Sequence, residues 1–482
     1  MPAWTRLDTV LLVVVTAVAA VVRFAGLGNP DALVFDEIFY AQNACLLVAS
    51  PDVCGIVEPL SNAHPPLGQW LIAAGIAAVG YDPFGWRVAA AIAGVLTVAL
   101  TYVLARRVLR DADPRWAAIG ATAAAGLLAL DVLHLVLSRV AMLDVFVTLF
   151  VVAAFLAITV DLQSAPPEAG GGVRRFLFGR PWRLAAGVLI GAAVAVKWSG
   201  AYSALGIVLL VVVCEVARRR TDADGQARGW GSAFGLAFRA EGLRTAVLLG
   251  VVPLLVYLAT YIGVADGALI AAPWREGSWF YDVAHHQVAM ARFHAGLEGH
   301  HPYESPSWSW FLLKRPVAFW FDEGGDAYHH ILALGNPLAW WPSLATFGWL
   351  AVRWVRGGRD LASVVLIGAL AAYLPWLILG FARSQVFLWY VLPALPFLYA
   401  AVGIAAARWH GWARGLLAVS LAAALAGFLF FWPIATASPL TPDDWQLRMW
   451  LTNCERPDGA PTLELPDDTI NTGPPPDGWC WI

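Results

Sequence analysis

The sequence predicts an all-α polytopic membrane protein with about eleven transmembrane helices, and three observations predict this class. Of its 482 residues, 59% are hydrophobic and only 13% are charged, and the mean hydropathy is +0.65. Soluble domains carry about 25% charged residues, so this composition suits a lipid environment. Apolar runs of roughly 18 to 25 residues, long enough to cross a bilayer, recur along the chain. Arginines cluster between alternate runs, as expected for the loops on one side of a membrane.

The apolar runs are expected to be the transmembrane helices. The stretch 68–80 is also apolar but short, and counting it as a span would move the next arginine-rich loop to the opposite side. We therefore expect it to be an interfacial helix along the outer leaflet. The expected spans lie near residues 8–26, 86–105, 116–133, 140–160, 184–199, 201–217, 245–264, 336–352, 361–380, 387–407 and 414–432.

The arginines predict the orientation of these spans. Most of the 31 lysines and arginines fall in loops that share one side, and the positive-inside rule makes that side cytoplasmic. The N-terminus is then inside, while the loops 27–85 and 265–335 and the tail 436–482 are outside. Residues 1–435 are expected to form one transmembrane catalytic domain. The net charge of −3, without a basic low-complexity arm, gives no indication of nucleic-acid binding.

The cysteines agree with this topology. Cys45 and Cys54 fall in the first outside loop, and Cys454 and Cys480 fall in the outside tail. Two local pairs in an oxidising compartment predict two disulfides, with unpaired thiols as the alternative.

An adjacent pair of carboxylates, Asp36 and Glu37, follows the first span and is the strongest indication of chemistry. Phe35, Phe39 and Tyr40 surround the pair in sequence. Desolvation by these rings would raise a carboxyl pKa, which suits a general base. The alternative is a helix N-cap or a solvated loop pair. A rigid His-Pro-Pro turn follows at residues 64–66, where the prolines fix the backbone.

These segments together resemble the protein O-mannosyltransferase family, whose fold is the C-type membrane glycosyltransferase fold. The strongest part of the resemblance is Phe-Asp-Glu-Ile-Phe-Tyr at 35–40 with His-Pro-Pro-Leu-Gly at 64–68. Three further stretches resemble the family in the same order: Leu137 to Val145, Val196 to Gly200, and His301 to Trp310 with Arg315 to Val317.

Two departures from the family pattern matter. Asn62 stands where the family often has an acidic residue, so no role of that carboxylate carries over. The loop 265–335 has no room for the large β-trefoil domain of the eukaryotic members. The chain therefore resembles the bacterial branch, and a bacterial plasma membrane is the expected location.

The resemblance implies a polyprenyl-phosphate mannose donor, Ser or Thr acceptors in exported polypeptides, and the secretion translocon as a possible partner. A lipid phosphate is a good leaving group, so a carboxylate base and cations on the phosphate would be enough for one inverting displacement without a cofactor. We expect Asp36 to take the hydroxyl proton and Glu37 to orient the acceptor or share the role.

Cations near the outer ends of the spans are expected to bind the donor phosphate. An ionisable residue there is costly, and snorkelling to the headgroups is the alternative. Arg139 is the first choice, followed by Lys197 and Arg383. Residues expected to bind substrate are His64, Trp198, His301, Tyr303 and Arg315.

A metal-dependent mechanism and two other functions compete with this interpretation. A catalytic metal is not expected, because the ten histidines include no H-x-x-x-H spacing. An aminoarabinose-transferase-like enzyme with a lipid acceptor shares the fold, but usually has Lys where this chain has His64. A secondary transporter would show an inverted repeat, and none is detected.

Overall fold

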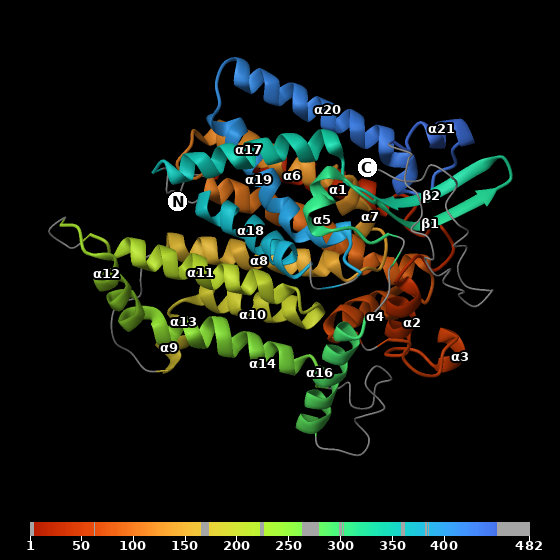
Figure 1. The fold of residues 1–482 in the computed structure, drawn as a ribbon, viewed down its shortest axis with the longest axis horizontal. Coiled ribbons are helices and arrows are strands. Elements are labelled where there is room, and N and C mark those ends of the chain that lie inside the picture. Colours follow the sequence, from red (N-terminus) through yellow and green to blue (C-terminus); the bar gives the residue numbers. More distant parts are fainter. Residues whose placement is uncertain are drawn as a thin grey trace.

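The computed structural model describes residues 4–61, 63–164, 173–221, 226–262, 279–297, 301, 303–357, 362–380, 383 and 385–450. Long helices lie side by side in one bundle (Figure 1). The longer helices of the bundle are α1 (Arg6–Phe24), α5 (Pro83–Val108), α6 (Pro114–Ala129), α8 (Asp144–Gln163), α10 (Pro181–Val196), α11 (Gly200–Arg218), α17 (Pro337–Val355), α18 (Ala362–Leu379), α19 (Leu395–Arg408) and α20 (Trp412–Ala435).

The remaining helical elements include an irregular stretch, α16 and several short helices. One continuous helical stretch is divided into α12 (Trp230–Ala237), η1 (Phe238–Gly242), α13 (Leu243–Ala246), η2 (Val247–Val251) and α14 (Val252–Ala259). The others are α2 (Glu37–Cys45), α3 (Pro51–Cys54), α4 (Leu67–Val79), α7 (Val132–Leu137), α9 (Val173–Phe178), α16 (Trp279–Ala295), η4 (Ser307–Leu312), η5 (Leu388–Ala394) and α21 (Pro442–Gln446).

The membrane fold expected from composition is confirmed. Each of the eleven expected runs overlaps a helix, and eight helices within the described ranges are long and apolar enough to cross a membrane. Three of the expected spans do not meet this criterion of length and hydropathy. They are α6 and α10, each of 16 residues, and α17, which carries four tryptophans. The count of eleven spans therefore stays a prediction.

Local sequence signals explain where several of these helices begin. An Asp or Asn N-cap precedes a proline at the start of α5, α6 and α17. The cap side chain accepts a backbone hydrogen bond, and proline suits the first helical position because its missing N–H would have no partner there. Close helix packing also uses small residues: a Cβ on Gly120 of α6 would lie 2.3 Å from the carbonyl oxygen of Gly403 in α19.

The short elements of the first loop gather at one end of the bundle. Figure 1 shows α2, α3 and α4 together there, beside the β-hairpin. The expected Cys45–Cys54 disulfide is confirmed, with its Cα atoms 5.6 Å apart. Cys454 and Cys480 lie outside the described residues, so their pairing stays a prediction. The short apolar helix expected at 68–80 is α4, which packs closely against α5 at Gly75, where a Cβ would lie 2.8 Å from Val88 Cγ1.

One element departs from the all-α prediction. Strands β1 (Val317–Gly324) and β2 (Ala327–Ala333) form an antiparallel hairpin within a segment expected to be a loop. Aromatic and β-branched residues favour this pairing, and Gly325 supplies the positive φ of +64° at the turn. The start of the tail docks on the hairpin, where Trp445 Nε1 donates to His330 Nδ1 at 3.1 Å.

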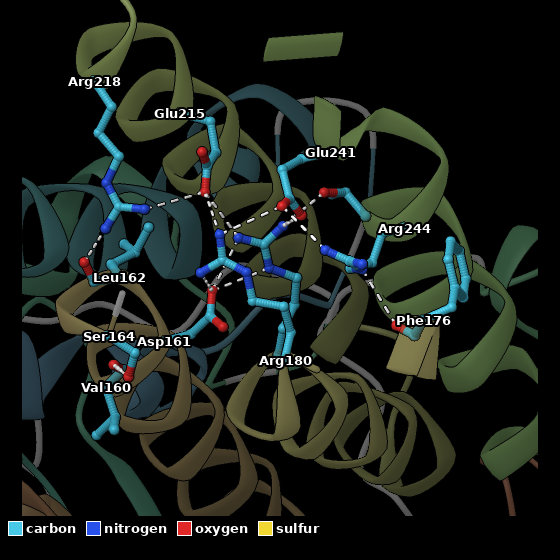
Figure 2. A network of polar contacts seen from close by, with 12 residues as sticks. Val160, Asp161, Leu162, Ser164, Phe176, Arg180, Glu215, Arg218, Glu241 and Arg244 are labelled. Carbon is cyan, nitrogen blue, oxygen red and sulfur yellow. Dashed lines mark hydrogen bonds and ion pairs between the residues drawn. The ribbon is translucent and has the colours of Figure 1, made fainter. Parts of the chain in front are cut away.

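A buried cluster of charges lies at the other end of the bundle. Figure 2 shows Arg180 of the α10 N-terminus among Asp161, Glu215 and Glu241, which come from α8, α11 and η1. Arg183, one turn further into α10, contacts the same carboxylates: 2.9 Å to Asp161, 3.0 Å to Glu215 and 3.1 Å to Glu241. Sequence alone treats these arginines as loop charges, whereas the structure makes them a connection between four helical segments.

Replacing Arg183 with Met should lower the free energy of unfolding by about 3–5 kcal/mol, because buried carboxylates would lose their partner. The thermal unfolding midpoint of the detergent-purified protein measures this loss. Arg174→Met is the matched control, since Arg174 is exposed on neighbouring α9. Equal midpoints for the two variants would show that the cluster does not hold these helices together.

Candidate active site

Asp36 lies at the N-cap position of α2, where the chain turns sharply after the first span. Phe35 has a positive φ of +49°, which is uncommon for a residue with a side chain. Its ring stacks on Phe319 of β1, with centroids 4.5 Å apart, and meets Trp389 of η5 edge-on at 5.4 Å. These ring contacts hold the strained residue, and therefore fix where the Asp36 side chain begins.

Glu37 is fully buried, and both of its carboxylate oxygens accept hydrogen bonds. The Arg87 guanidinium binds it through two hydrogen bonds, from Nε at 2.9 Å and from Nη2 at 2.8 Å. The backbone N–H groups of Val34 and Ala141 also donate to it, at 2.9 and 2.8 Å. This arrangement joins α2 to α5 and to the turn before α8. It is a structural role, whereas the sequence predicted a catalytic one for Glu37.

Asp36 has a different environment from its neighbour. It keeps partial solvent access, and Tyr40 donates a hydrogen bond to it from one turn along α2. Burial raises the pKa of Asp36 to about 6; the positive charge of Lys197 opposes this rise and the negative charge of Asp144 adds to it. A carboxylate whose pKa lies near the working pH is suited to accept a proton.

Lys197 lies at the C-terminal end of α10 and pairs with the first residue of α8. Its Nζ is 3.0 Å from both carboxylate oxygens of Asp144, and 4.4 Å from the centre of the Tyr390 ring. Both side chains of the ion pair are nearly buried, at 11% and 6% exposure. The pair therefore places a desolvated cation near Asp36.

A second group lies beside this one and contains two histidines. The His64 ring is 6.0 Å from Tyr40 and 5.5 Å from His294 of α16. The Trp198 ring is 6.2 Å from His294. Burial and nearby cations, Lys197 among them, keep the pKa of His64 well below its usual range. His64 is accordingly neutral at pH 7.

Arg383 joins this group through His294. Its Nη2 lies 3.2 Å from His294 Nδ1, and its Nε is buried without a hydrogen-bond partner among the described residues. The positive charges of Arg383 and Lys197 both act on His64. The structure thus brings together four of the predicted residues around Asp36: His64, Lys197, Trp198 and Arg383.

His301 and Tyr303 belong to a neighbouring aromatic series. His301 contacts the Phe387 ring at 5.1 Å, and Phe387 stacks on Trp389 at 4.3 Å. Trp389 in turn supports Phe35. The backbone N–H of Tyr303 donates to His301 Nδ1 at 3.1 Å. These two residues are therefore linked to the site by packing, and their contact with substrate stays a prediction.

Two further predicted cations, Arg139 and Arg315, have surroundings of their own. Arg139 caps the C-terminal end of α1, where its two terminal nitrogens donate to the carbonyls of Val22, Arg23, Ala25 and Gly26. This contact occupies the guanidinium that the sequence assigned to the donor phosphate. Arg315 has a positive φ of +59° and precedes Pro316 at the entry to β1. Neither position gives these residues a described contact with Asp36.

Four residues of the site were missed by sequence reasoning, and the signals for them differ. Tyr40 was noted only as a desolvating ring, although it lies one helical turn after Asp36. Asp144 lies within a stretch that resembles the family, and His294 was weighed only as a metal ligand. Nothing in the local sequence distinguishes Tyr390. Among the described residues no three His, Cys, Asp or Glu side chains gather as metal ligands do, and the metal-free reaction stays a prediction.

Two neighbouring variants should separate structural from chemical roles. Glu37→Gln should lower the unfolding free energy by about 3–5 kcal/mol, because it leaves the Arg87 charge buried and unpaired. Asp36→Asn should leave stability unchanged or slightly higher at pH 7, because the ionised carboxylate is disfavoured there by burial. Thermal unfolding in detergent compares them, and a larger loss for Asp36→Asn than for Glu37→Gln would contradict this division.

Comparison with known proteins identifies the family of this chain. A family model described as dolichyl-phosphate-mannose-protein mannosyltransferase matches residues 13–263. Another, described as the C-terminal four-transmembrane region of protein-O-mannosyltransferase, matches residues 279–454. A polyprenol-phosphate-mannose–protein mannosyltransferase of Mycobacterium tuberculosis is 33% identical, over 91% of this chain and 90% of its own length.

Solved structures show the same fold. The Pmt1–Pmt2 protein O-mannosyltransferase complex of S. cerevisiae, bound to the sugar donor, matches with a TM-score of 0.73 at 16% identity over 93% of each chain. ArnT from Cupriavidus metallidurans in the apo state matches with a TM-score of 0.53 at 20% identity, over 89% of this chain and 77% of its own. The predicted C-type glycosyltransferase fold is confirmed. On the two family models and the mycobacterial relative together, the chain belongs to the protein O-mannosyltransferase family.

Proposed function

We propose that this protein transfers mannose from polyprenyl-phosphate mannose to Ser or Thr hydroxyls of exported polypeptides. The observation that carries the proposal is the juxtaposition of Asp36, a carboxylate with a pKa raised to about 6, with the cations Lys197 and Arg383. Relatives named for this donor and for protein acceptors, at about the same chain length, support it.

The reaction needs only one displacement at the sugar. The acceptor hydroxyl oxygen forms a bond to the anomeric carbon from one face, while the bond from that carbon to the phosphate oxygen breaks on the other. The hydroxyl proton goes to Asp36, and polyprenyl phosphate leaves with the bonding electrons. The anomeric configuration inverts. No proton is required by the leaving group, because a phosphate diester oxygen already leaves as a stable anion.

The two cations have separate tasks in this mechanism. Lys197 uses two hydrogen bonds on Asp144 and keeps a third N–H for the phosphate. Arg383 retains a buried Nε–H without a described partner. Preorganised donors in a desolvated site stabilise the charge that develops on the leaving group. Glu37 and Arg87 fix α2 so that Asp36 is held opposite these cations.

The membrane arrangement follows from charge. Helices α2 and α3, which carry Asp36 and the disulfide, lie at one end of the bundle, and α9, next to the start of α10 with its buried arginines, lies toward the other (Figure 1). Under the positive-inside rule the site faces the outside of a bacterial plasma membrane, with the N-terminus in the cytoplasm. Acceptors would arrive there during export, which makes the secretion translocon a reasonable partner.

A lipid acceptor is the competing function within the same fold. The likeness to ArnT supports the fold alone, at 20% identity. The relatives that cover this chain almost completely are named for protein acceptors, which favours a polypeptide. Supplying one labelled donor with either a Thr-rich peptide or a lipid acceptor distinguishes the two, and label found only in lipid would overturn the proposal.

Asp36→Asn should reduce transfer to a Thr-rich peptide by about 10²- to 10⁴-fold, the usual contribution of a general base. Transfer of radiolabelled mannose from polyprenyl-phosphate mannose measures it in purified protein. Asp31→Asn is the control, since Asp31 is an exposed carboxylate of the same loop. Normal turnover by Asp36→Asn would remove the base assignment.

The kcat of the wild type should rise with pH through about 6 and level off above it. The direction of this pH dependence follows from the raised pKa of Asp36, because the ionised carboxylate is the base and is lost as pH falls below about 6. Initial rates at saturating donor from pH 5 to pH 8 give the profile. A flat profile over this range would show that no group with this pKa accepts the proton.

A further inference from the structure

His294 connects three parts of the site that are distant in sequence. It belongs to α16, and its Nε2 lies 2.9 Å from the carbonyl oxygen of Ala63, directly before His64. Its Nδ1 lies 3.2 Å from Nη2 of Arg383, between α18 and η5. Its ring also lies within 6.2 Å of the Trp198 ring. One imidazole therefore contacts the His-Pro-Pro loop, the segment of Arg383 and the end of α10.

The two hydrogen bonds determine the protonation state of this ring. A carbonyl oxygen can only accept, so Nε2 carries the hydrogen that is donated to Ala63. A guanidinium nitrogen can only donate, so Nδ1 presents its lone pair to Arg383. Both contacts are satisfied only by the neutral ring with hydrogen on Nε2. A second proton on Nδ1 would remove the bond to Arg383 and place two cations against each other.

We propose that His294 is a positioning residue for donor binding, which holds the Arg383 guanidinium and the loop before α4 in the arrangement that receives the donor phosphate. This inference rests on the proposed function and deepens it. Arg383 would contact the phosphate, and His294 acts through Arg383. In this arrangement Arg383 keeps its buried Nε–H without a hydrogen-bond partner among the described residues, and this N–H could donate to the phosphate.

The surroundings of His294 oppose its protonation. The charged groups that act on it are Arg383 and Lys197, both positive, and the neutral His64 ring lies 5.5 Å away. Burial, the largest effect, and these cations lower the pKa of His294, while its bond to the Ala63 carbonyl raises it. The net shift is downward. The neutral form is thus kept at pH 7, and donor affinity should fall only as pH drops below the ordinary range of histidine.

Two substitutions separate positioning from packing. His294→Phe keeps an aromatic ring but loses both hydrogen bonds, and we expect the KM for polyprenyl-phosphate mannose to rise about tenfold or more with a smaller change in kcat. His294→Gln keeps one donor and one acceptor but cannot be protonated. It should restore most of the donor affinity and remove the fall of donor affinity at acid pH. His285→Phe, on an exposed position of the same helix, is the control.

A double variant tests whether His294 acts through Arg383. If it does, His294→Phe combined with Arg383→Met should raise the donor KM no further than Arg383→Met alone. Additive effects of the two substitutions on donor KM would overturn the inference. A His294→Phe enzyme with the donor KM of the wild type would overturn it too, as would one in which only thermal stability and kcat fall. Should His294→Phe fail to fold, the pH dependence of donor KM in His294→Gln decides: an acid limb identical to that of the wild type would overturn it.

Binding of the product, polyprenyl phosphate, distinguishes a failure of the His294 inference from a failure of the proposed function. Polyprenyl phosphate without sugar should raise the thermal unfolding midpoint of the wild type, and should do so less in His294→Phe. A wild type that neither binds polyprenyl phosphate nor transfers mannose would overturn both proposals. A wild type that does both, beside a His294→Phe protein with unchanged binding, would overturn this inference alone.

Discussion

The contact between α8 and α10 is fixed by buried ion pairs at both of its ends, and the site depends on it. At one end Lys197 binds Asp144 at 3.0 Å, and at the other Arg183 binds Asp161 at 2.9 Å. At 1.5 Å per residue these pairs lie about 25 Å apart along α8. A shift of one helix along the other would break both pairs and leave buried charges uncompensated. The position of the Lys197 ammonium group is therefore determined by contacts far from it.

Two adjacent carboxylates acquire opposite properties because helix α2 begins between them. Glu37 turns into the protein and forms a buried ion pair with Arg87 at 2.8 Å. Asp36 remains at the N-cap with partial solvent access, and burial raises its pKa to about 6. Strong pairing suits a carboxylate that holds helices together, whereas a proton acceptor must remain unpaired. Phe35 determines how the chain enters α2, because aromatic contacts from β1 and η5 hold its strained backbone directly before the two carboxylates.

Elements from distant parts of the sequence converge on these carboxylates at one end of the bundle. The first loop supplies Asp36 and His64, the end of α10 supplies Lys197, and α16 supplies His294. The hairpin supports Phe35, although its own residues lie almost three hundred positions later. A site built in this way can position a lipid-linked donor between helix ends, because buried ion pairs join two of the long helices behind it.

The sequence by itself determined the membrane class, the Cys45–Cys54 bridge, the family and the position of the acidic pair. These features follow from local properties: run length, composition, spacing and contiguous motifs. Only the tertiary structure decided which carboxylate is buried, that Arg139 caps α1, and that Arg180 and Arg183 form a cluster with carboxylates from three other helical segments. The reason is physical, since a charge takes its role from its partner. Glu37 and Arg87 are 50 residues apart, and Lys197 and Asp144 are 53 residues apart. Such partners are brought together by helix packing, which no local pattern in the sequence records.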